Sequence, residues 1–383
     1  MKIGFFTDSY LPAVHGVEIS MEAFRTNLEK LGHEVFIYAP RSPGYKDKNP
    51  RVFRLESMRV VKEPEMRLAF PLAHKGKLKD IVNFKLDIVH AHTPFSLGLL
   101  GKFIAAHQKI PFIYTHHTHY PEYAKAYFKE KFILPKIAKA WSAWFCENSD
   151  AVIAPSYKIK NLLRDYGVKK PIYVLPTGID LKLFKRTAKS WKSARLLRKK
   201  LKLSEKDKLL VFVGRIGREK NIEFLIKSAA EIADKRSDVK FIIVGTGPYF
   251  QKYKTAVKKL GLNNVVFTGA VPHKNLPVYY QAADLFVFAS LTETQGIVIL
   301  EAMASGLPVI ALKDDAFREI VTDNKNGFLI DPNSSPVFFV KKALEILDDS
   351  ALHKKFSRAS LQIVKNFSEE KQAEKLAEIY KKL

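Results

Sequence analysis

Cysteine is almost absent from the sequence, which has one, Cys146, in 383 residues. A single thiol cannot form an internal disulfide, so we expect a fold held by its apolar core and a reducing compartment. Cys146 follows Trp144 and Phe145 in an apolar run, which indicates a buried, inert thiol and not a nucleophile.

Long hydrophobic runs are also absent. No stretch comes near the roughly eighteen uninterrupted apolar residues that a membrane-spanning helix needs. Residues 1–10 lack a long apolar core and turn polar at Thr7, so they predict a first strand and no signal peptide. Apolar residues still make up 47% of the chain and aromatic residues 12%, which is typical of a globular protein. The length favours two domains of ordinary size.

Acidic residues are few. The chain has 39 of them against 64 lysines and arginines, a net charge of +25 and an isoelectric point near 9.8. Such an excess of positive charge favours nucleic acid, an anionic membrane surface or phosphorylated small molecules as partners. The sequence has no helix-turn-helix, zinc-finger spacing or RNP-like segment, which argues against the first of these.

Apolar strand patterns alternate with amphipathic helix patterns along the chain. Lys2–Thr7, Val17–Lys30 and Glu34–Ala39 form the first strand–helix–strand unit, and a second alternating set begins with a strand at Lys208–Val213. This alternation predicts an α/β fold with two doubly wound, Rossmann-like parallel sheets in tandem. In such sheets ligands bind where the strands end.

A strongly basic segment, Lys182–Lys208, lies between the two alternating sets. It carries twelve lysines and arginines against two acids and shows little apolar periodicity. We therefore interpret it as a solvated connector between the domains. The expected domains are residues 1–177 and residues 178–367.

One stretch organises the second domain, Ser290–Pro308, with the sequence SLTETQGIVILEAMASGLP. A strand pattern ends before it, and the apolar run after Gly296 predicts a buried helix. A glycine directly before a helix leaves the first backbone N–H groups unpaired and lets an anion approach closely. Glu293 and Glu301 flank this point, and carboxylates suit sugar hydroxyls, so the stretch favours a nucleotide-sugar site. A strand–turn–helix corner with surface glutamates is the alternative.

Two cations, Arg215 and Lys220, follow the first strand of the second domain in the segment GRIGREKN. At a strand end they could neutralise a diphosphate, the arginine with two parallel hydrogen bonds, whereas a solvated turn is the alternative. GTGP, at Gly245–Pro248, is not a dinucleotide-binding fingerprint because its third glycine is missing. It predicts a tight turn at the edge of a strand. The base or ribose of a bound nucleotide could also lie against this turn.

Five histidines follow two strands of the N-terminal domain, in HAHTP (90–94) and HHTHY (116–120). Their spacing allows a metal site, but a hydrolytic zinc site also needs a nearby carboxylate, and the nearest in sequence is Glu122. Their place at strand ends favours polar side chains that line a cleft, and structural hydrogen bonding is the third alternative. Asp8 and Asp87 also adjoin strands, and nothing beyond position nominates either as a base.

Six motifs in a fixed order resemble the retaining glycosyltransferases of family 4, which have the GT-B fold. They are GR-x4-K at Gly214–Lys220, E-x7-E at Glu293–Glu301, HAHTP, TxH at Thr115–His117, PTGID-x3-F ending at Phe184, and NGFLIDP at Asn326–Pro332. The resemblance covers nearly the whole chain. It implies an acceptor-binding N-terminal domain and a nucleotide-sugar-binding C-terminal domain that face each other across a cleft. It also implies that the last helix, 368–383, packs back on the first domain.

The resemblance implies a role for each matching residue. His117 would contact the donor sugar, Arg215 and Lys220 would stabilise the departing diphosphate, and Glu293 would hold sugar hydroxyls. Donor binding would also involve backbone groups and a ribose-binding carboxylate, in the set Gly16, Gly214, Gly245, Gln295, Gly296, Ile297, Val298 and Glu301. The family uses neither metal nor cofactor and retains configuration without an enzymic nucleophile. Its first loop commonly reads GG where this chain has His15-Gly16.

Within the family, THHTHYPEY and TETQG, with Gln295 where many relatives have phenylalanine, resemble the branch that glucosylates diacylglycerol. This resemblance implies UDP-glucose as donor, 1,2-diacylglycerol as acceptor and an α-glucosyl glycolipid as product. Two basic segments with interleaved apolar residues, Arg51–Lys85 and Tyr120–Phe145, suit docking on anionic lipid, although their aromatic residues could also face the core. We therefore expect a cytoplasmic enzyme at the cytoplasmic face of the membrane.

Other activities stay open. An enzyme of this family could use GDP-mannose with phosphatidylinositol, or transfer a UDP-sugar in polysaccharide synthesis. The chain could also be a non-catalytic basic module that binds nucleotide or RNA. The non-catalytic alternative is disfavoured because the chain keeps the full set of Arg215, Lys220, Glu293 and Glu301. Tight RNA binding without any binding of a sugar nucleotide would favour it instead.

Overall fold

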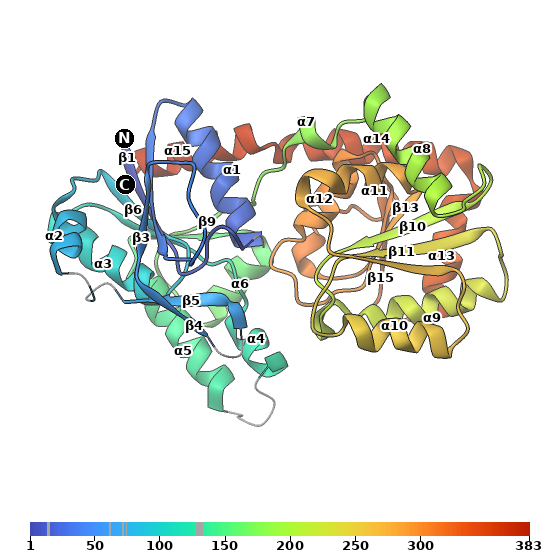
Figure 1. Cartoon of the computed structure of the whole chain (residues 1–383), viewed down its shortest axis with the longest axis horizontal. Coiled ribbons are helices and arrows are strands. Elements are labelled where there is room, and N and C mark those ends of the chain that lie inside the picture. The colour runs from blue at the N-terminus through green and yellow to red at the C-terminus, as the bar shows by residue number, and fades with distance from the viewer. Residues whose placement is uncertain (14–15, 61–62, 71–72, 74, 128–132) are drawn as a thin grey trace. The chain divides into compact units, whose positions relative to one another are not determined.

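The chain divides into two compact units, each with its own sheet and core (Figure 1). The computed structural model describes the chain except for residues 14–15, 61–62, 71–72, 74 and 128–132. The first unit consists of residues 1–178 and 369–383, and the second of residues 179–368.

The first unit is built on a seven-stranded sheet in the order β3-β2-β1-β6-β7-β8-β9, with every neighbouring pair parallel. The order reverses between β1 and β6, so loops leave these two neighbours in opposite directions. The strands are β1 (Lys2–Phe6), β2 (Glu34–Pro40), β3 (Val52–Leu55), β6 (Ile88–Ala91), β7 (Phe112–Thr115), β8 (Ala151–Ala154) and β9 (Ile172–Val174).

Helices cover both faces of this sheet. They are α1 (Gly16–Lys30), α2 (Lys75–Asn83), α3 (Ser96–Gln108), α4 (Tyr120–Tyr127), α5 (Ile133–Glu147), α6 (Tyr157–Asp165) and α15 (Glu369–Lys381). One face packs against α3, α5 and α6, where Leu97, Phe145 and Ile159 are buried, and the other against α1 and α15. Cys146 lies in the first of these cores, which confirms its expected burial, and burial raises the pKa of its thiol to about 12.

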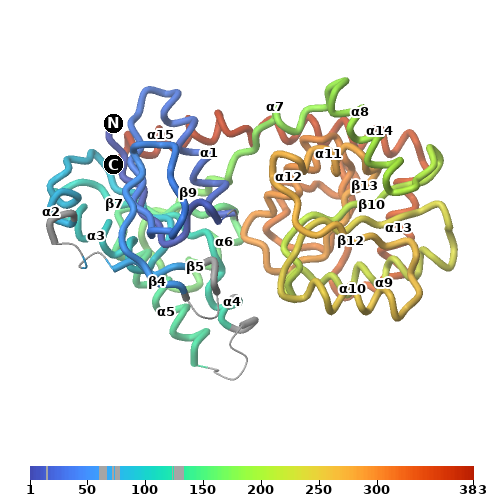
Figure 2. Tube along the Cα trace, viewed as in Figure 1, coloured from blue at the N-terminus to red at the C-terminus, as the bar shows by residue number. Residues whose placement is uncertain are grey.

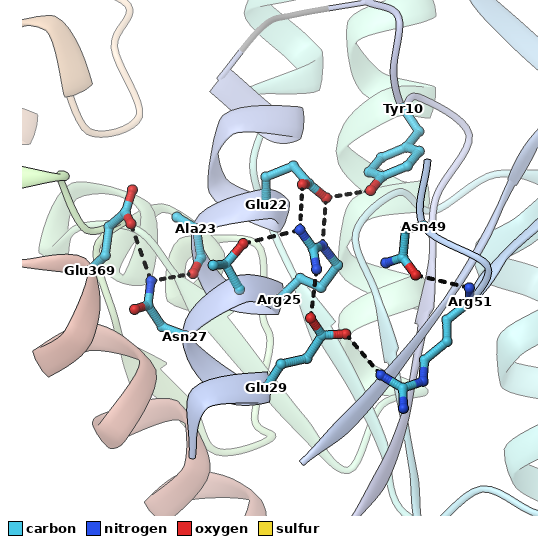
Figure 3. Close-up of polar contacts among 10 residues, drawn as sticks. Tyr10, Glu22, Ala23, Arg25, Asn27, Glu29, Asn49, Arg51 and Glu369 are labelled. Carbon is cyan, nitrogen blue, oxygen red and sulfur yellow. Dashed lines mark hydrogen bonds and ion pairs between the residues drawn. The ribbon is translucent and has the colours of Figure 1, made fainter. Parts of the chain in front are cut away.

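The last helix of the chain belongs to the first unit. Figure 2 shows α15, in red, beside the blue N-terminal segments. Leu376 and Tyr380 are buried against the sheet, and the Asn27 amide of α1 donates to the Glu369 carboxylate at 3.1 Å (Figure 3). The same helix α1 carries a polar network in which Arg25 bridges Glu22 and Glu29. Burial and these contacts fix α15 on the N-terminal sheet.

After β2, residues 41–51 form turns and coil, and regular strand structure begins again at Val52. β3 joins the main sheet, and β4 (Ser57–Val60) pairs antiparallel with β5 (Glu63–Ala69) as a separate two-stranded ribbon. The alternation of Phe53 and Leu55 is too short to mark a strand without its partner β2.

The second unit has a six-stranded parallel sheet in the order β12-β11-β10-β13-β14-β15. Its order reverses between β10 and β13, so both expected doubly wound sheets are confirmed. The strands are β10 (Lys208–Val213), β11 (Val239–Val244), β12 (Val265–Gly269), β13 (Leu285–Phe288), β14 (Val309–Leu312) and β15 (Gly327–Ile330).

Helices α8, α11 and α12 lie on one side of this sheet, and α9 and α10 on the other (Figure 1). The helical segments of the unit are α7 (Leu181–Phe184), α8 (Ala188–Lys200), η2 (Arg218–Lys220), α9 (Ile222–Ala233), α10 (Phe250–Lys259), η3 (His273–Asn275), α11 (Leu276–Ala282), α12 (Ile297–Ala304), η4 (Asp315–Phe317), α13 (Pro336–Asp348), α14 (Ser350–Ile363) and η5 (Val364–Phe367).

The interpretation of residues 182–208 as a connector between the domains is wrong, although most of the basic side chains of the segment are exposed as expected. Most of the segment forms α7 and α8, and it belongs to the second unit. Ala194 is buried and Leu197 packs against the core, while α8 lies along α11. The many charges concealed this narrow apolar stripe, because only one face of α8 is covered.

The two basic segments expected to dock on lipid contain both core and surface residues. Phe145 is fully buried, whereas Ile133 and Trp144 on α5 and Leu68 and Phe70 near β5 are exposed. Tyr123, Tyr127, Phe128, Phe132, Met66 and Leu72 lie outside the described side chains. Within the described part of the chain, no helix is both long enough and apolar enough to cross a bilayer.

Candidate active site

The loops that leave β10 and β13 meet at the point where the strand order of the second sheet reverses. Open α/β sheets bind ligands at such points. The Lys220 ammonium after β10 forms an ion pair with the Glu293 carboxylate after β13, and both side chains are mostly buried. The Ser290 hydroxyl also donates to the Glu219 carbonyl at 3.1 Å. The structure therefore brings together a predicted cation and a predicted carboxylate, 73 residues apart.

Arg215 lies at the start of the same loop. Its guanidinium is 3.5 Å from the Glu219 carboxylate, and its side chain is 30% exposed. Arg215 and Lys220 are thus partly buried and held by carboxylates, which does not fit a solvated turn. The pair presents two cations at one sheet edge, a charge that suits a diphosphate.

The loops after β10 and β11 contact each other at Gly214 and Gly245. The Gly214 N–H donates to the Val244 carbonyl at 3.0 Å, and a Cβ at Gly245, whose φ is 136°, would lie 1.9 Å from the Gly214 oxygen. The Gly245 N–H donates to the Gly269 carbonyl. The GTGP segment is therefore a tight turn that supports the Arg215 loop, and its Gly245 amide is used inside the fold.

Gly296 marks the start of α12, the predicted helix. Its φ is 85°, a conformation that favours glycine, and a Cβ there would lie 2.8 Å from the Phe317 ring. The helix begins at Ile297, so the N–H groups of Ile297 and Val298 have no carbonyl of the preceding turn to bind. Gln295 is buried just before this point. These features make the N-terminus of α12 a suitable place for an anion.

Glu301 is not a surface glutamate. Its side chain is 2% exposed, and its carboxylate accepts hydrogen bonds from His273 Nε2 at 2.8 Å and from the Tyr280 hydroxyl at 2.7 Å. Burial and the nearby carboxylate raise the pKa of Tyr280 well above its ordinary value, so its hydroxyl keeps the donated proton. Neither partner is evident in the sequence, although the position of His273 just after β12 is a signal that could have nominated it.

Asp8 is the buried acid at the reversal point of the first sheet. It accepts hydrogen bonds from the Thr93 hydroxyl at 2.7 Å, the Ser96 hydroxyl and the Leu97 N–H at 3.1 Å. Burial is the main cause that raises its pKa above the usual range. Asp8 thus binds the N-terminus of α3, where Phe95 offers no capping side chain. Gly16, the predicted phosphate-contacting residue, is exposed at the start of α1.

His90, His92 and His116 are buried at the ends of β6 and β7, where burial lowers the pKa of each imidazole, whereas His117 and His119 are partly exposed. His90 binds the Tyr380 hydroxyl through Nδ1 and the Thr115 hydroxyl through Nε2, both at 2.6 Å, so it is structural. His117 Nε2 lies 3.0 Å from His92 Nδ1, and burial lowers the pKa of His117 to about 3. Among the described residues no three His, Cys, Asp or Glu side chains are grouped to hold a metal ion.

Two doubly wound domains in tandem are the architecture of the GT-B glycosyltransferases, and the cations and carboxylates at the strand-order reversal of the second sheet suit a nucleotide-sugar. Residues 14–183 match the family described as Glycosyltransferase Family 4, and residues 193–363 match Glycosyl transferases group 1. The chain is 38% identical over 337 residues to an alpha-monoglucosyldiacylglycerol synthase from Streptococcus pneumoniae, covering 86% of this chain and 75% of that protein. The chain therefore belongs to glycosyltransferase family 4 and is a glycosyltransferase.

Two further similarities bear on the fold and the activity. A GDP-mannose-dependent alpha-mannosyltransferase from Mycobacterium tuberculosis is 30% identical over 339 residues, covering 86% of this chain and 84% of that protein. The structure of HepE from Anabaena in complex with UDP superimposes with a TM-score of 0.80 at 20% identity, over the full length of both chains. The GT-B fold is therefore confirmed.

Proposed function

We propose that this enzyme transfers glucose from UDP-glucose to the free hydroxyl of 1,2-diacylglycerol, with retention of the anomeric configuration. The observation that carries the proposal is the meeting of Lys220 and Glu293 beside the N-terminus of α12. Similarity to an alpha-monoglucosyldiacylglycerol synthase supports the glucosyl group and the lipid acceptor. The UDP complex of HepE supports a uridine nucleotide in the same fold.

The reaction exchanges one bond at the anomeric carbon. The bond between C1 of glucose and the β-phosphate oxygen breaks, and a bond between C1 and the acceptor oxygen forms on the same face. The hydroxyl proton leaves with the diphosphate. A displacement of this kind needs no protein nucleophile, so its catalysis depends on stabilising the charge that develops on the leaving group.

The second domain supplies that stabilisation in this proposal. Arg215 and Lys220 neutralise the diphosphate, and the N–H groups of Ile297 and Val298 add donors at the positive end of α12. Glu293 accepts hydrogen bonds from sugar hydroxyls. Its ion pair with Lys220 couples sugar position to leaving-group charge.

The ribose and the sugar have their own proposed contacts. Glu301 is held by His273 and Tyr280, and a carboxylate oxygen can accept further hydrogen bonds from ribose hydroxyls. His117 in the first domain contacts the donor sugar as a neutral imidazole, because its lowered pKa excludes the charged form near pH 7. We assign no metal or cofactor to the reaction.

A bilayer surface is where diacylglycerol is found, and the first domain has an apolar face suited to it. Leu99 and Phe103 of α3 and Ile133, Ile137 and Trp144 of α5 are exposed, Phe103 by 58% and Ile133 by 64%. Lys102 lies over the Trp144 ring at 5.4 Å from its centroid. Exposed aromatic and aliphatic side chains beside a lysine suit peripheral membrane contact.

Mannosyl transfer from GDP-mannose is the second candidate, because a relative of nearly equal coverage is a GDP-mannose-dependent enzyme. Radiolabelled UDP-glucose and GDP-mannose, each offered with vesicles that contain diacylglycerol and an anionic lipid, separate the two. The proposal predicts a labelled glycolipid with UDP-glucose alone, and none in matched vesicles without diacylglycerol. Product from GDP-mannose only would replace the glucosyl proposal with the mannosyl one.

A further inference from the structure

Helix α8 is fastened to the second domain at both ends. Thr187 and Ser190 cap its N-terminus reciprocally, each side chain accepting from the other residue's backbone N–H. Near its C-terminus the Arg198 guanidinium donates to the Ala282 carbonyl at 2.8 Å and to the Asp284 carboxylate at 3.2 Å. These contacts hold the helix at the entry to β13, so its orientation on the domain is fixed.

The two faces of α8 differ in chemistry. Ala194, Leu197 and Leu201 pack toward the core. At 3.6 residues per turn the opposite face carries exposed basic side chains and one exposed leucine, at Lys189, Lys192, Arg195, Leu196, Lys199 and Lys200.

No acidic residue occurs between Asp180 and Glu205, so this face has almost no neutralising partner within its own segment. Arg195 is the exception, at 3.1 Å from Glu205, and that pair is largely exposed and weak. Lys182, Lys185 and Lys202 extend the same charge beyond the ends of the helix. A fixed helix with such a surface would concentrate anions over it.

We propose that the basic face of α8 is a docking surface for an anionic phospholipid bilayer, separate from the apolar face of α3 and α5. The inference rests on the proposed lipid acceptor, which places the enzyme's substrate in a bilayer. Lysines with long flexible stems suit a fluid array of lipid phosphates, and Trp191 and Leu196, 45% and 57% exposed, add apolar contact at the headgroup level.

The structure favours lipid over nucleic acid. A single-strand binding surface relies on open aromatic faces for base stacking. The one tryptophan of α8, Trp191, already has the Arg186 guanidinium over its ring, at 4.6 Å from the centroid. The apolar face of α8 is taken by the domain core, so the helix cannot lie inside the bilayer. The larger part of its contribution to binding is therefore electrostatic and weakens at high salt, while Trp191 and Leu196 add a smaller apolar part.

The test measures vesicle binding of the full chain in the absence of donor and diacylglycerol. The substitutions Lys189→Gln, Lys192→Gln and Lys199→Gln are combined in one variant. A matched variant neutralises Lys254, Lys258 and Lys259, three exposed lysines on α10 at the other side of the sheet. Cosedimentation with vesicles of phosphatidylcholine and phosphatidylglycerol is followed from low to high salt, with melting temperatures as the folding control.

The α8 variant should bind vesicles at least about tenfold more weakly at low salt and show a shallower salt dependence, while the α10 variant follows the wild type. Equal losses in both variants would reduce the effect to net charge and overturn the proposal. Unchanged vesicle binding by the α8 variant, with RNA binding lost instead, would assign the face to nucleic acid. Glucosyl transfer to diacylglycerol in detergent micelles is measured separately, so that failure of the proposed function and failure of the docking proposal can be distinguished. No transfer in micelles would contradict the proposed function, while the vesicle-binding result would remain valid.

Discussion

Lys220 and Glu293 form an ion pair across the two loops that meet at the strand-order reversal of the second sheet. Neither residue lies inside a long regular element, so the pair is set by the ends of β10 and β13. The Glu219 carbonyl that accepts from Ser290 binds the same two loops together. The position of Lys220 is thus determined by the sheet, which is what a residue that stabilises a leaving group requires.

Replacing Lys220 by methionine should lower kcat about 100-fold or more, because an electrostatic contact to the leaving group is strongest in the transition state. Donor affinity should change less than about tenfold. Turnover and donor Kd are measured on the same preparation. Lys227→Met is the matched control, since Lys227 is an exposed lysine on α9 paired with Glu223. Equal losses in kcat and affinity would reduce Lys220 to a binding residue.

Glu301→Gln should weaken binding of the nucleotide-sugar by about tenfold or more. The amide keeps the volume of the side chain but loses the charge that orients ribose hydroxyls, and its NH2 group opposes the donors of His273 and Tyr280. Calorimetric titration with UDP measures the affinity, and the melting temperature shows how much stability changes. Wild-type affinity in a folded variant would remove Glu301 from the ribose site.

Tyr280→Phe tests whether Tyr280 only holds the Glu301 carboxylate in place or itself contacts the nucleotide. The substitution deletes one hydrogen bond to the buried carboxylate, which should cost about 1.5–3 kcal/mol of unfolding free energy. Glu301 then keeps its charge and its bond to His273, so UDP affinity should fall less than in Glu301→Gln. Urea unfolding and UDP titration together check this order, and the reverse order would assign ribose binding to Tyr280 instead.

The buried histidines should make the protein lose stability on mild acidification. His90 has its pKa lowered from 6.5 to about 3 by burial, so between these values the unfolded chain binds the proton more readily than the folded one. Stability therefore falls as the pH drops below 6.5, by about 1.4 kcal/mol per pH unit for this residue. His90→Gln should lose about 2 kcal/mol less than the wild type between pH 6.5 and 5.0. The unfolding free energy of both proteins is measured by denaturant titration at pH 6.5 and at pH 5.0. An equal decrease in both proteins would contradict a lowered pKa for His90.

Arg198→Met should destabilise the second domain by about 2–3 kcal/mol, because the Asp284 carboxylate and the Ala282 carbonyl lose a charged donor. Arg195→Met, one turn earlier on the exposed face, should cost less than about 0.5 kcal/mol. Denaturant unfolding of both variants measures the difference. If both substitutions lower the unfolding free energy by less than about 0.5 kcal/mol, Arg198 does not hold α8 on the domain and residues 182–208 are a loosely held connector.

The alternation of strand and helix patterns was sufficient to predict both parallel sheets, because each βαβ unit is a local feature of the chain. The motif around Gly296 likewise marks the start of α12 through a local requirement for positive φ. Glycine and apolar spacing carry such information over short distances. The general architecture and the loops that hold Lys220 and Glu293 therefore follow from sequence.

Contacts between distant residues were not predictable. Glu301 is a plain helix residue in sequence, and only the tertiary fold shows that His273 and Tyr280 bind its carboxylate. The basic segment was misinterpreted for the same reason, since Arg198 finds its partners at Ala282 and Asp284. Asp8, which we could not assign from sequence, binds the start of α3 across 89 positions.

The most direct test of the central claim is the structure of the transfer product. The enzyme is incubated with radiolabelled UDP-glucose and diacylglycerol vesicles, the glycolipid is separated by thin-layer chromatography, and its sensitivity to α- and β-glucosidases is compared. The account predicts one labelled glycolipid that α-glucosidase removes and β-glucosidase leaves intact. A β-linked product, or bound UDP-glucose with no transfer to diacylglycerol, would contradict it.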